Sequence, residues 1–351
     1  MAIILHFGFP KTATTSLQAF FHAERDLLAQ QGVLYPIVDD DSKQRYLKSM
    51  IPPPGAPVEP RIEKIRDKLN ALRSLVERRK PSHVLLSCEE LGNAHDFEIT
   101  AETLVPLANY LKSIDDDVHL LAYVRNPEEY YLARMQEKLK TSGGVIAPAS
   151  YRPLFAPTIA AYEAAFGKKA IVRHFQKGNL VGGSILEDFR TAIAPLVQLD
   201  FSGISEKRVN ESLSPEVMFV LDMLRTNFAD TDKPLAYSYA ESSFLWRDLQ
   251  KIAVQMSLTG KPVLRPAVAR LIREGAAGEA AEIAEKYGIV FTDHAAADDG
   301  AEEHSSQAPL VSVESIIHVD RPAALSLLNR FALSGLRALQ AKKSAAKGAK
   351  G

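Results

Sequence analysis

The sequence predicts an α/β protein, with a parallel β-sheet flanked by helices and a helical C-terminal region. The first observation is alternation, because four apolar runs rich in β-formers are separated by helical patterns. The second is the apolar character of these runs, which is typical of parallel strands covered on both faces. The third is length, since 351 residues suffice for one large α/β domain with additions.

The strands are expected at residues 2–7, 83–87, 118–124 and 170–175. Helical patterns separate them at about 15–30, 61–79, 100–113, 127–140 and 157–166. From about residue 214 onward the chain is helical, with segments at 215–228, 240–257 and 263–286. Ligands of such sheets bind at the C-terminal ends of the strands. The loops that follow the strands are therefore the expected site.

Composition narrows the classes of function. A formal net charge of −1 gives no general attraction to nucleic acid. Cys88 is the single cysteine, which excludes an intrachain disulfide framework and a cysteine-built zinc site. The sequence has no apolar run of membrane-spanning length, and its N-terminus starts on a strand with no cleavable signal pattern. A cytoplasmic protein is expected.

The first strand leads into a loop and a helix with the composition of an anion site. Gly8 and Pro10 form a tight turn, and a lysine and several hydroxyl residues follow. Strand, loop and helix in this order point backbone N–H groups and a helix N-terminus at one spot. The pattern favours a phosphate or sulfate pocket, and the alternative is an ordinary strand–helix turn capped by Thr and Ser. The residues expected to line the pocket are Lys11, Thr12, Ala13, Thr14, Thr15 and Ser16.

This loop differs from the usual nucleotide-hydrolase loop, which has a glycine directly before its lysine. Here Pro10 precedes Lys11, and only two residues separate Gly8 from Lys11. The run Pro-Lys-Thr-x-Thr-Thr at the start of a helix resembles the 5′-phosphosulfate loop of sulfotransferases that use 3′-phosphoadenosine-5′-phosphosulfate (PAPS). The resemblance implies a P-loop NTPase-like sheet, a PAPS site at residues 11–16, and a catalytic role for Lys11.

A second motif places an arginine at the end of the strand at 118–124. Arg125 follows this strand, and Asn126 and Pro127 open the next helix. An arginine at this edge suits bidentate phosphate recognition, with pairing to a carboxylate as the alternative. The motif resembles the 3′-phosphate element of the same family, which implies that Arg125 holds the 3′-phosphate. This chain has Ala133 where the family has a serine, and Arg134 is expected to compensate if the helix presents it inward.

A third motif ends the strand at 83–87 in paired carboxylates, Glu89 and Glu90. Sulfuryl transfer to an alcohol needs a base for the hydroxyl proton, and a partly desolvated carboxylate with a raised pKa suits that role. The resemblance implies that Glu89 is this base, because bacterial and carbohydrate N-sulfating members have a glutamate near here. Glu90 and His95 remain alternatives, and both glutamates are also explained as surface residues that open a helix.

The resemblance implies a PAPS-dependent sulfotransferase that modifies a hydroxyl or amine of a small-molecule or glycan acceptor without a metal. One alternative is a P-loop kinase or NTPase, which needs a further acidic residue for Mg²⁺ at the C-terminal end of a strand. Residues Asp115–Asp117 instead precede the strand at 118–124, at its N-terminal end. The other is a catalytically inactive nucleotide-binding module, suggested by Ala133. Weaker similarities lie at 166–175, 187–189 and 209–214, and Lys207–Arg208 is expected to replace a late phosphate-binding loop of the family.

The expected domains are a sulfotransferase-like α/β domain at 1–291, an acidic flexible linker at 292–320, and an amphipathic helix with a basic tail at 321–351. The apolar stripe of the helix is followed by lysines at one end, so docking on the protein is favoured over interfacial contact with a membrane. Residues 36–60 are expected to be a mobile loop that covers or lines the acceptor site. The stripe consists of Leu325, Leu328, Phe331, Leu336 and Leu339, and the tail carries Lys342, Lys343, Lys347 and Lys350.

Overall fold

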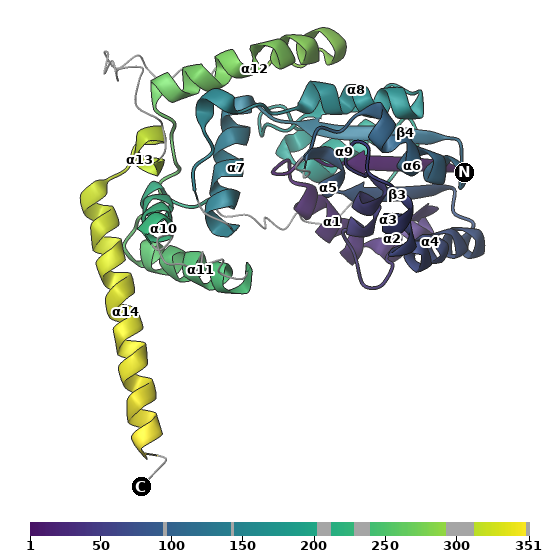
Figure 1. The fold of residues 1–351 in the computed structure, drawn as a ribbon. Coiled ribbons are helices and arrows are strands. Elements are labelled where there is room, and N and C mark those ends of the chain that lie inside the picture. Colours follow the sequence, from purple (N-terminus) through teal and green to yellow (C-terminus); the bar gives the residue numbers. More distant parts are fainter. Residues whose placement is uncertain (94–96, 142–143, 202–211, 228–238, 293–311, 349–351) are drawn as a thin grey trace. The chain divides into compact units, whose positions relative to one another are not determined.

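The structure is a computed structural model that describes residues 1–93, 97–141, 144–201, 212–227, 239–292 and 312–348. The chain forms two compact units, which are described separately below (Figure 1). The first contains residues 1–126, 153–209 and 277–292, and the second contains residues 127–152, 210–276 and 293–351.

The first unit is built on one sheet of five parallel strands in the order β2-β3-β1-β4-β5. The α/β class, the parallel sheet and its flanking helices are therefore confirmed. The four predicted strands are present, and a fifth, β2, was not predicted because it is only two residues long. The strands are β1 (Ala2–Phe7), β2 (Val33–Leu34), β3 (His83–Cys88), β4 (Val118–Val124) and β5 (Ile171–His174).

Strand β1 lies at the centre of the sheet, and all six of its residues are buried. This explains its apolar run without alternation, because helices cover both faces. On one face, Leu17 of α1 and Phe189 of α9 belong to the same buried cluster as Ile4 and Tyr123. On the other face, Phe7 stacks on Tyr162 of α8, with ring centroids 4.0 Å apart.

The helices of the first unit follow the predicted pattern, with breaks inside two of the expected segments. The segment predicted at 15–30 divides at Glu24, and the one at 61–79 divides at Lys64 and Ile65. The α-helices are α1 (Thr14–Ala23), α2 (Arg25–Gln30), α3 (Glu59–Glu63), α4 (Arg66–Arg79), α5 (Glu90–Asn93), α6 (Ala101–Lys112), α8 (Phe155–Phe166) and α9 (Ile185–Ile193), and the 3₁₀ helices are η1 (Arg45–Met50) and η3 (Val181–Gly183).

The segment at 36–60, predicted to be a mobile loop, is packed onto the first unit through η1. Tyr46, Leu47 and Met50 are buried, and the buried amide of Gln44 accepts a hydrogen bond from the Ser87 N–H at 2.8 Å. The sequence did not predict this packed element, because its apolar side chains are spaced irregularly among polar ones and find partners only in the tertiary structure. The mobility of the remainder of the segment stays a prediction.

The second unit is helical. Helix α14 packs on α10 and α11, and within the predicted linker α13 is folded, with Val313 and Ile316 buried. Residues 293–311 of that linker lie outside the described residues. None of the helices in the described ranges combines the length and hydrophobicity that a membrane crossing requires. The elements are α7 (Pro127–Thr141), η2 (Pro148–Ser150), α10 (Pro215–Asn227), α11 (Tyr239–Gln255), the first half of α12 (Pro266–Tyr287), α13 (Val313–Ile316) and α14 (Arg321–Gly348).

Candidate functional site

The predicted anion loop, Gly8–Ala13, joins β1 to α1 at the C-terminal edge of the sheet. The chain leaves β1 toward β2 on one side of the sheet and leaves β4 toward β5 on the other. The carboxyl ends of β1 and β4 therefore flank the point where the direction of winding reverses. Open α/β sheets bind their ligands in the crevice at that point.

The loop holds two non-glycine residues in the left-handed region, Lys11 with φ 65° and Ala13 with φ 63°. This conformation costs a residue with a side chain roughly 1 to 2 kcal/mol, and such strain concentrates at functional sites. The loop offsets this cost with internal bonds. The Thr12 and Thr14 hydroxyls both donate to the Phe9 carbonyl, at 2.7 Å and 3.4 Å.

These bonds place the Thr12 and Thr14 hydroxyls inside the loop, and both side chains are buried. The groups available to a ligand are instead the backbone N–H groups in the first turn of α1, because a helix provides no carbonyl acceptor for its first N–H groups. The Ser16 N–H is an exception, because it donates to the Ala13 carbonyl at 3.0 Å. The sequence had assigned all of these residues to the ligand.

Two glycines allow the loop to pack tightly against neighbouring elements. The Gly8 N–H donates to the Cys88 carbonyl at 3.1 Å, which ties the start of the loop to the end of β3. A Cβ atom on Gly92 of α5 would lie 2.4 Å from the Gly8 carbonyl oxygen and 2.9 Å from the Phe9 Cα. Only a glycine at position 92 permits this approach of α5 to the loop.

The close packing of α5 brings the first of the paired glutamates to α1. The Thr15 hydroxyl donates to Glu89 Oε2 at 3.4 Å, and both side chains are half-buried. Glu90 instead accepts a bond from the buried Cys88 thiol at 3.5 Å. Burial and the Glu90 carboxylate together raise the pKa of Cys88 well above its usual value. Of the two glutamates, Glu89 is thus the one bonded to the first turn of α1, and His95 lies outside the described residues.

Arg125 follows β4 and reaches the same loop. Its Nη1 donates to the Lys11 carbonyl at 3.1 Å, and its guanidinium carbon lies 5.6 Å from the centroid of the Phe175 ring. Aromatic stacking and a carbonyl bond orient the planar guanidinium, which is the group best suited to bidentate phosphate binding. Lys11, Glu89 and Arg125, which the sequence placed on three different strand ends, are therefore brought to one loop.

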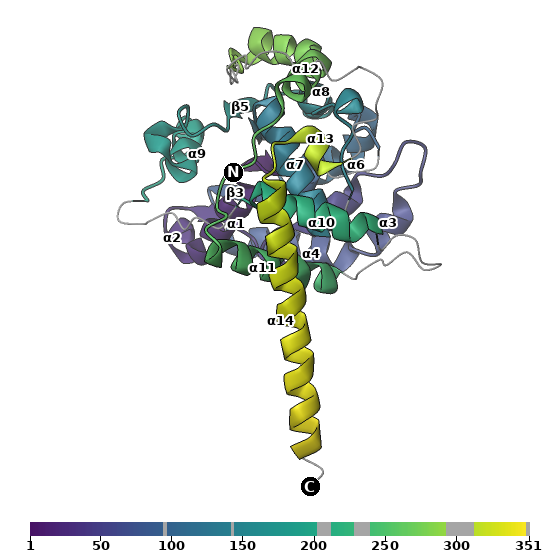
Figure 2. The same cartoon turned by 90° about the vertical axis from the view of Figure 1, so that its left-hand side faces the viewer.

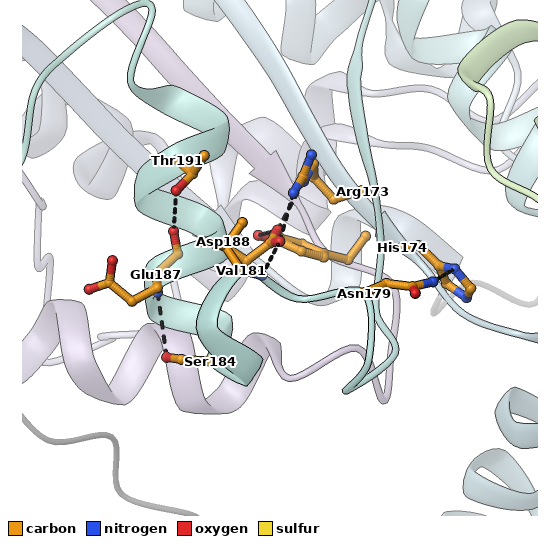
Figure 3. Close-up of polar contacts among 9 residues, drawn as sticks. Arg173, His174, Asn179, Val181, Ser184, Glu187, Asp188 and Thr191 are labelled. Carbon is orange, nitrogen blue, oxygen red and sulfur yellow. Dashed lines mark hydrogen bonds and ion pairs between the residues drawn. The ribbon is translucent and has the colours of Figure 1, made fainter.

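A buried carboxylate, Asp188 of α9, bonds Arg173 of β5 and the N–H group of Val181 (Figure 3). Its Oδ1 accepts from Tyr123 at 3.0 Å and from Arg173 Nε at 2.9 Å. Its Oδ2 accepts from Arg173 Nη2 at 2.7 Å and from the Val181 N–H at 3.1 Å. Since Tyr123 lies on β4 and Arg173 on β5, this network joins both strands to α9. The sequence had suggested only a weak family similarity at 187–189.

A second buried network lies around Ser87, near the end of β3, and was not predicted. The Ser87 hydroxyl is 2.9 Å from His6 Nδ1, its carbonyl accepts from Gln18 at 2.8 Å, and its N–H donates to Gln44. Burial lowers the pKa of His6 to about 3, so the ring is neutral at physiological pH. The network joins β1, α1, β3 and the segment before η1. Its central residue, Ser87, lies two residues before Glu89. No local motif signals it, because its members come together only by tertiary pairing.

The other predicted residues are located as follows. Arg134 lies in α7, in the second unit, half-buried beside the buried Ala133, and its role in 3′-phosphate binding stays a prediction. Lys207 and Arg208 lie outside the described residues. Within the described ranges, no group of three His, Cys, Asp or Glu side chains is arranged to hold a metal ion.

The arrangement combines a strained loop, a helix N-terminus, a lysine, an oriented guanidinium and a half-buried carboxylate at one sheet edge. Such a site can bind an anionic ligand and accept a proton from a neighbouring group. Comparisons with protein-family models, with curated proteins and with solved structures find no match to this chain.

Proposed function

We propose that this protein is a sulfotransferase that moves the sulfuryl group of PAPS to a hydroxyl or amine of an acceptor, with a carbohydrate or glycan as the acceptor class that the family resemblance implies. The observation that carries the proposal is the meeting of three strand ends at one loop. Arg125 donates to the Lys11 carbonyl at 3.1 Å, and Glu89 accepts from Thr15 of the same loop–helix junction at 3.4 Å.

The roles of the residues follow from their chemistry. The first N–H groups of α1 would bind the 5′-phosphate, and Arg125 would bind the 3′-phosphate. The acceptor oxygen or nitrogen forms a bond to sulfur while the bond from sulfur to the bridging oxygen breaks. Glu89 takes the acceptor proton, and the Lys11 ammonium stabilises the negative charge that develops on the bridging oxygen. The second product is 3′-phosphoadenosine 5′-phosphate.

The acidic residues that a kinase would need are engaged at the other edge of the sheet. Asp117 precedes β4 and pairs with Lys168 at 2.5 Å and with His119 at 3.1 Å. Asp115 pairs with the N-terminal ammonium at 3.5 Å. These pairs support the sulfotransferase over the kinase, because the start of β4 is a strand length away from the loop that follows β1.

A transfer assay tests the proposal. Purified protein is incubated with ³⁵S-labelled PAPS and fractionated glycans and small molecules, and the labelled products are separated. We expect transfer by the wild type, loss of transfer in Glu89→Gln, and retained binding of 3′-phosphoadenosine 5′-phosphate in that variant. Glu90→Gln is the matched control and should keep its transfer activity. Loss of transfer in Glu90→Gln alone would assign the base to Glu90, and absence of transfer from any fraction would contradict the proposal.

A further inference from the structure

Helix α14 carries exposed apolar side chains beyond its first turns. The helix packs on α10 and α11 through its first turns, where Ala324 and Leu327 are fully buried. After Phe331 its described side chains are exposed, including Leu333 at 53% and Leu336 at 57%. Both views of the structure show this part of the helix extending past α10 and α11 (Figures 1 and 2). Docking on the protein therefore accounts for the first part of α14 alone.

The same segment carries a concentrated positive charge. Residues 321–351 contain no aspartate or glutamate. Since the whole chain has a formal net charge of −1, the rest of the chain is net acidic. The basic residues of the segment are Arg321, Arg330, Arg337, Lys342, Lys343, Lys347 and Lys350.

Leucines and arginines lie side by side on the exposed helix. At about 100° per residue, Leu333 and Leu336 lie about 60° apart. Arg337 and Arg330 follow on the side of Leu333 away from Leu336, about 40° and about 60° beyond it. An apolar line beside a basic face, with low overall hydrophobicity, is the arrangement of helices that lie in the interface of a bilayer.

The charge also discriminates between kinds of partner. A second copy of α14 would bring like charges together, with no acidic residue in either helix to pair with them. A nucleic acid would satisfy the charge but leave Leu333 and Leu336 exposed. An anionic lipid surface satisfies both, because phospholipid headgroups attract the basic residues and the acyl boundary accepts the leucines.

We propose that the part of α14 beyond Phe331, with its lysines, binds the surface of anionic phospholipid bilayers, with Leu333 and Leu336 inserted at the headgroup boundary. The sequence favoured docking because the lysines cluster at one end of the helix, but the structure shows that packing on α10 and α11 covers only the other end. The start of the helix is held by α10 and α11, so its far end is the part that can reach a surface. The inference is independent of the proposed enzymatic function.

Vesicle flotation of the full-length protein tests the proposal. We expect binding to vesicles of phosphatidylglycerol mixed with phosphatidylcholine, no binding to phosphatidylcholine alone, and release at high ionic strength. The double variant Lys342→Gln/Lys343→Gln should bind about 30-fold more weakly, since each basic residue near an anionic leaflet contributes about 1 kcal/mol. Lys251→Gln/Lys261→Gln removes the same charge elsewhere in the second unit and should bind like the wild type.

A second pair of variants separates lipid from other polyanions. Leu333→Ser/Leu336→Ser keeps every charge and should lose vesicle binding, whereas Val254→Ser, at an exposed position of α11, should keep it. Circular dichroism verifies that each variant remains folded. Failure of the wild type to bind anionic vesicles would overturn the proposal. So would unchanged binding of the leucine variant together with equally tight binding of duplex DNA, which would indicate a nonspecific polyanion site.

Discussion

Substitution of Gly92 by alanine tests whether the packing of α5 sets the position of the anion loop. The added methyl group would lie 2.4 Å from the Gly8 carbonyl oxygen, 2.8 Å from the Gly8 carbonyl carbon and 2.9 Å from the Phe9 Cα. All three atoms are backbone atoms, so no side chain can rotate away to relieve the contact. Either the loop or α5 has to move.

The size of the effect follows from these distances. Ordinary contact begins at 3.4 Å, so the Gly8 carbonyl has to recede by about 1 Å. Overpacking of this kind lowers the free energy of unfolding by about 1 to 3 kcal/mol. A shift of about 1 Å also lengthens a hydrogen bond from about 2.9 Å to beyond its useful range. Each lost bond to a charged phosphate contributes about 1.5 to 3 kcal/mol, which weakens nucleotide binding by about 10- to 100-fold.

The assay is isothermal titration calorimetry with 3′-phosphoadenosine 5′-phosphate, at a temperature where circular dichroism shows each variant folded. Gly178→Ala is the matched control, because no atom lies within 4 Å of the position of its added methyl group. We expect Gly92→Ala to lose affinity and Gly178→Ala to keep it. Wild-type affinity in Gly92→Ala, or an equal loss in both variants, would show that the packing of α5 does not set the position of the loop.

Three further predictions concern the residues around the loop. Asp188→Asn should lower the free energy of urea unfolding by about 2 to 4 kcal/mol, because the partly buried Arg173 loses its carboxylate partner. Because burial keeps the folded-state pKa of His6 at about 3, below the ordinary 6.5, stability should fall as the pH drops below the ordinary value. In the wild type, the free energy of unfolding should be lower at about pH 5 than at about pH 7.5, and His6→Asn should reduce that difference by about 2 kcal/mol. The control His22→Asn, at an exposed position, should leave the difference unchanged. Arg125→Ala should weaken calorimetric binding of 3′-phosphoadenosine 5′-phosphate by at least about tenfold more than binding of adenosine 5′-phosphate, which lacks the 3′-phosphate; equal losses would contradict its assigned role.

Most of the sheet could be predicted from the sequence because burial of its longer strands produces a simple pattern of apolar residues. Residues of β1 are buried on both faces, so the strand is a continuous apolar run with a loop signal after it. The two-residue strand β2 has no such pattern, since its partners are fixed by pairing with β3. The folded segment around Gln44 was missed for the same reason, because its buried bond to Ser87 is formed between residues distant in the sequence.

The candidate site could be predicted in its outline and not in its internal bonding. Lys11, Glu89 and Arg125 follow strands, and parallel strands end at the same edge, so their proximity was predictable from position. The hydroxyls of Thr12 and Thr14 were expected to face a ligand, whereas both donate to the Phe9 carbonyl. The direction of each hydroxyl depends on the conformation of the loop. That conformation includes two left-handed residues, Lys11 and Ala13, which the motif alone does not reveal.

In the proposed function, the loop after β1 and the arginine after β4 form one site for a nucleotide with phosphates at both its 5′ and 3′ positions. Calorimetric titration of the full-length protein with 3′-phosphoadenosine 5′-phosphate, in a buffer containing a metal chelator, tests it most directly. We expect saturable binding at one site without metal, and weaker binding of adenosine 5′-phosphate. Binding of ATP with Mg²⁺ alone, and none of the 3′-phosphorylated nucleotide, would contradict it.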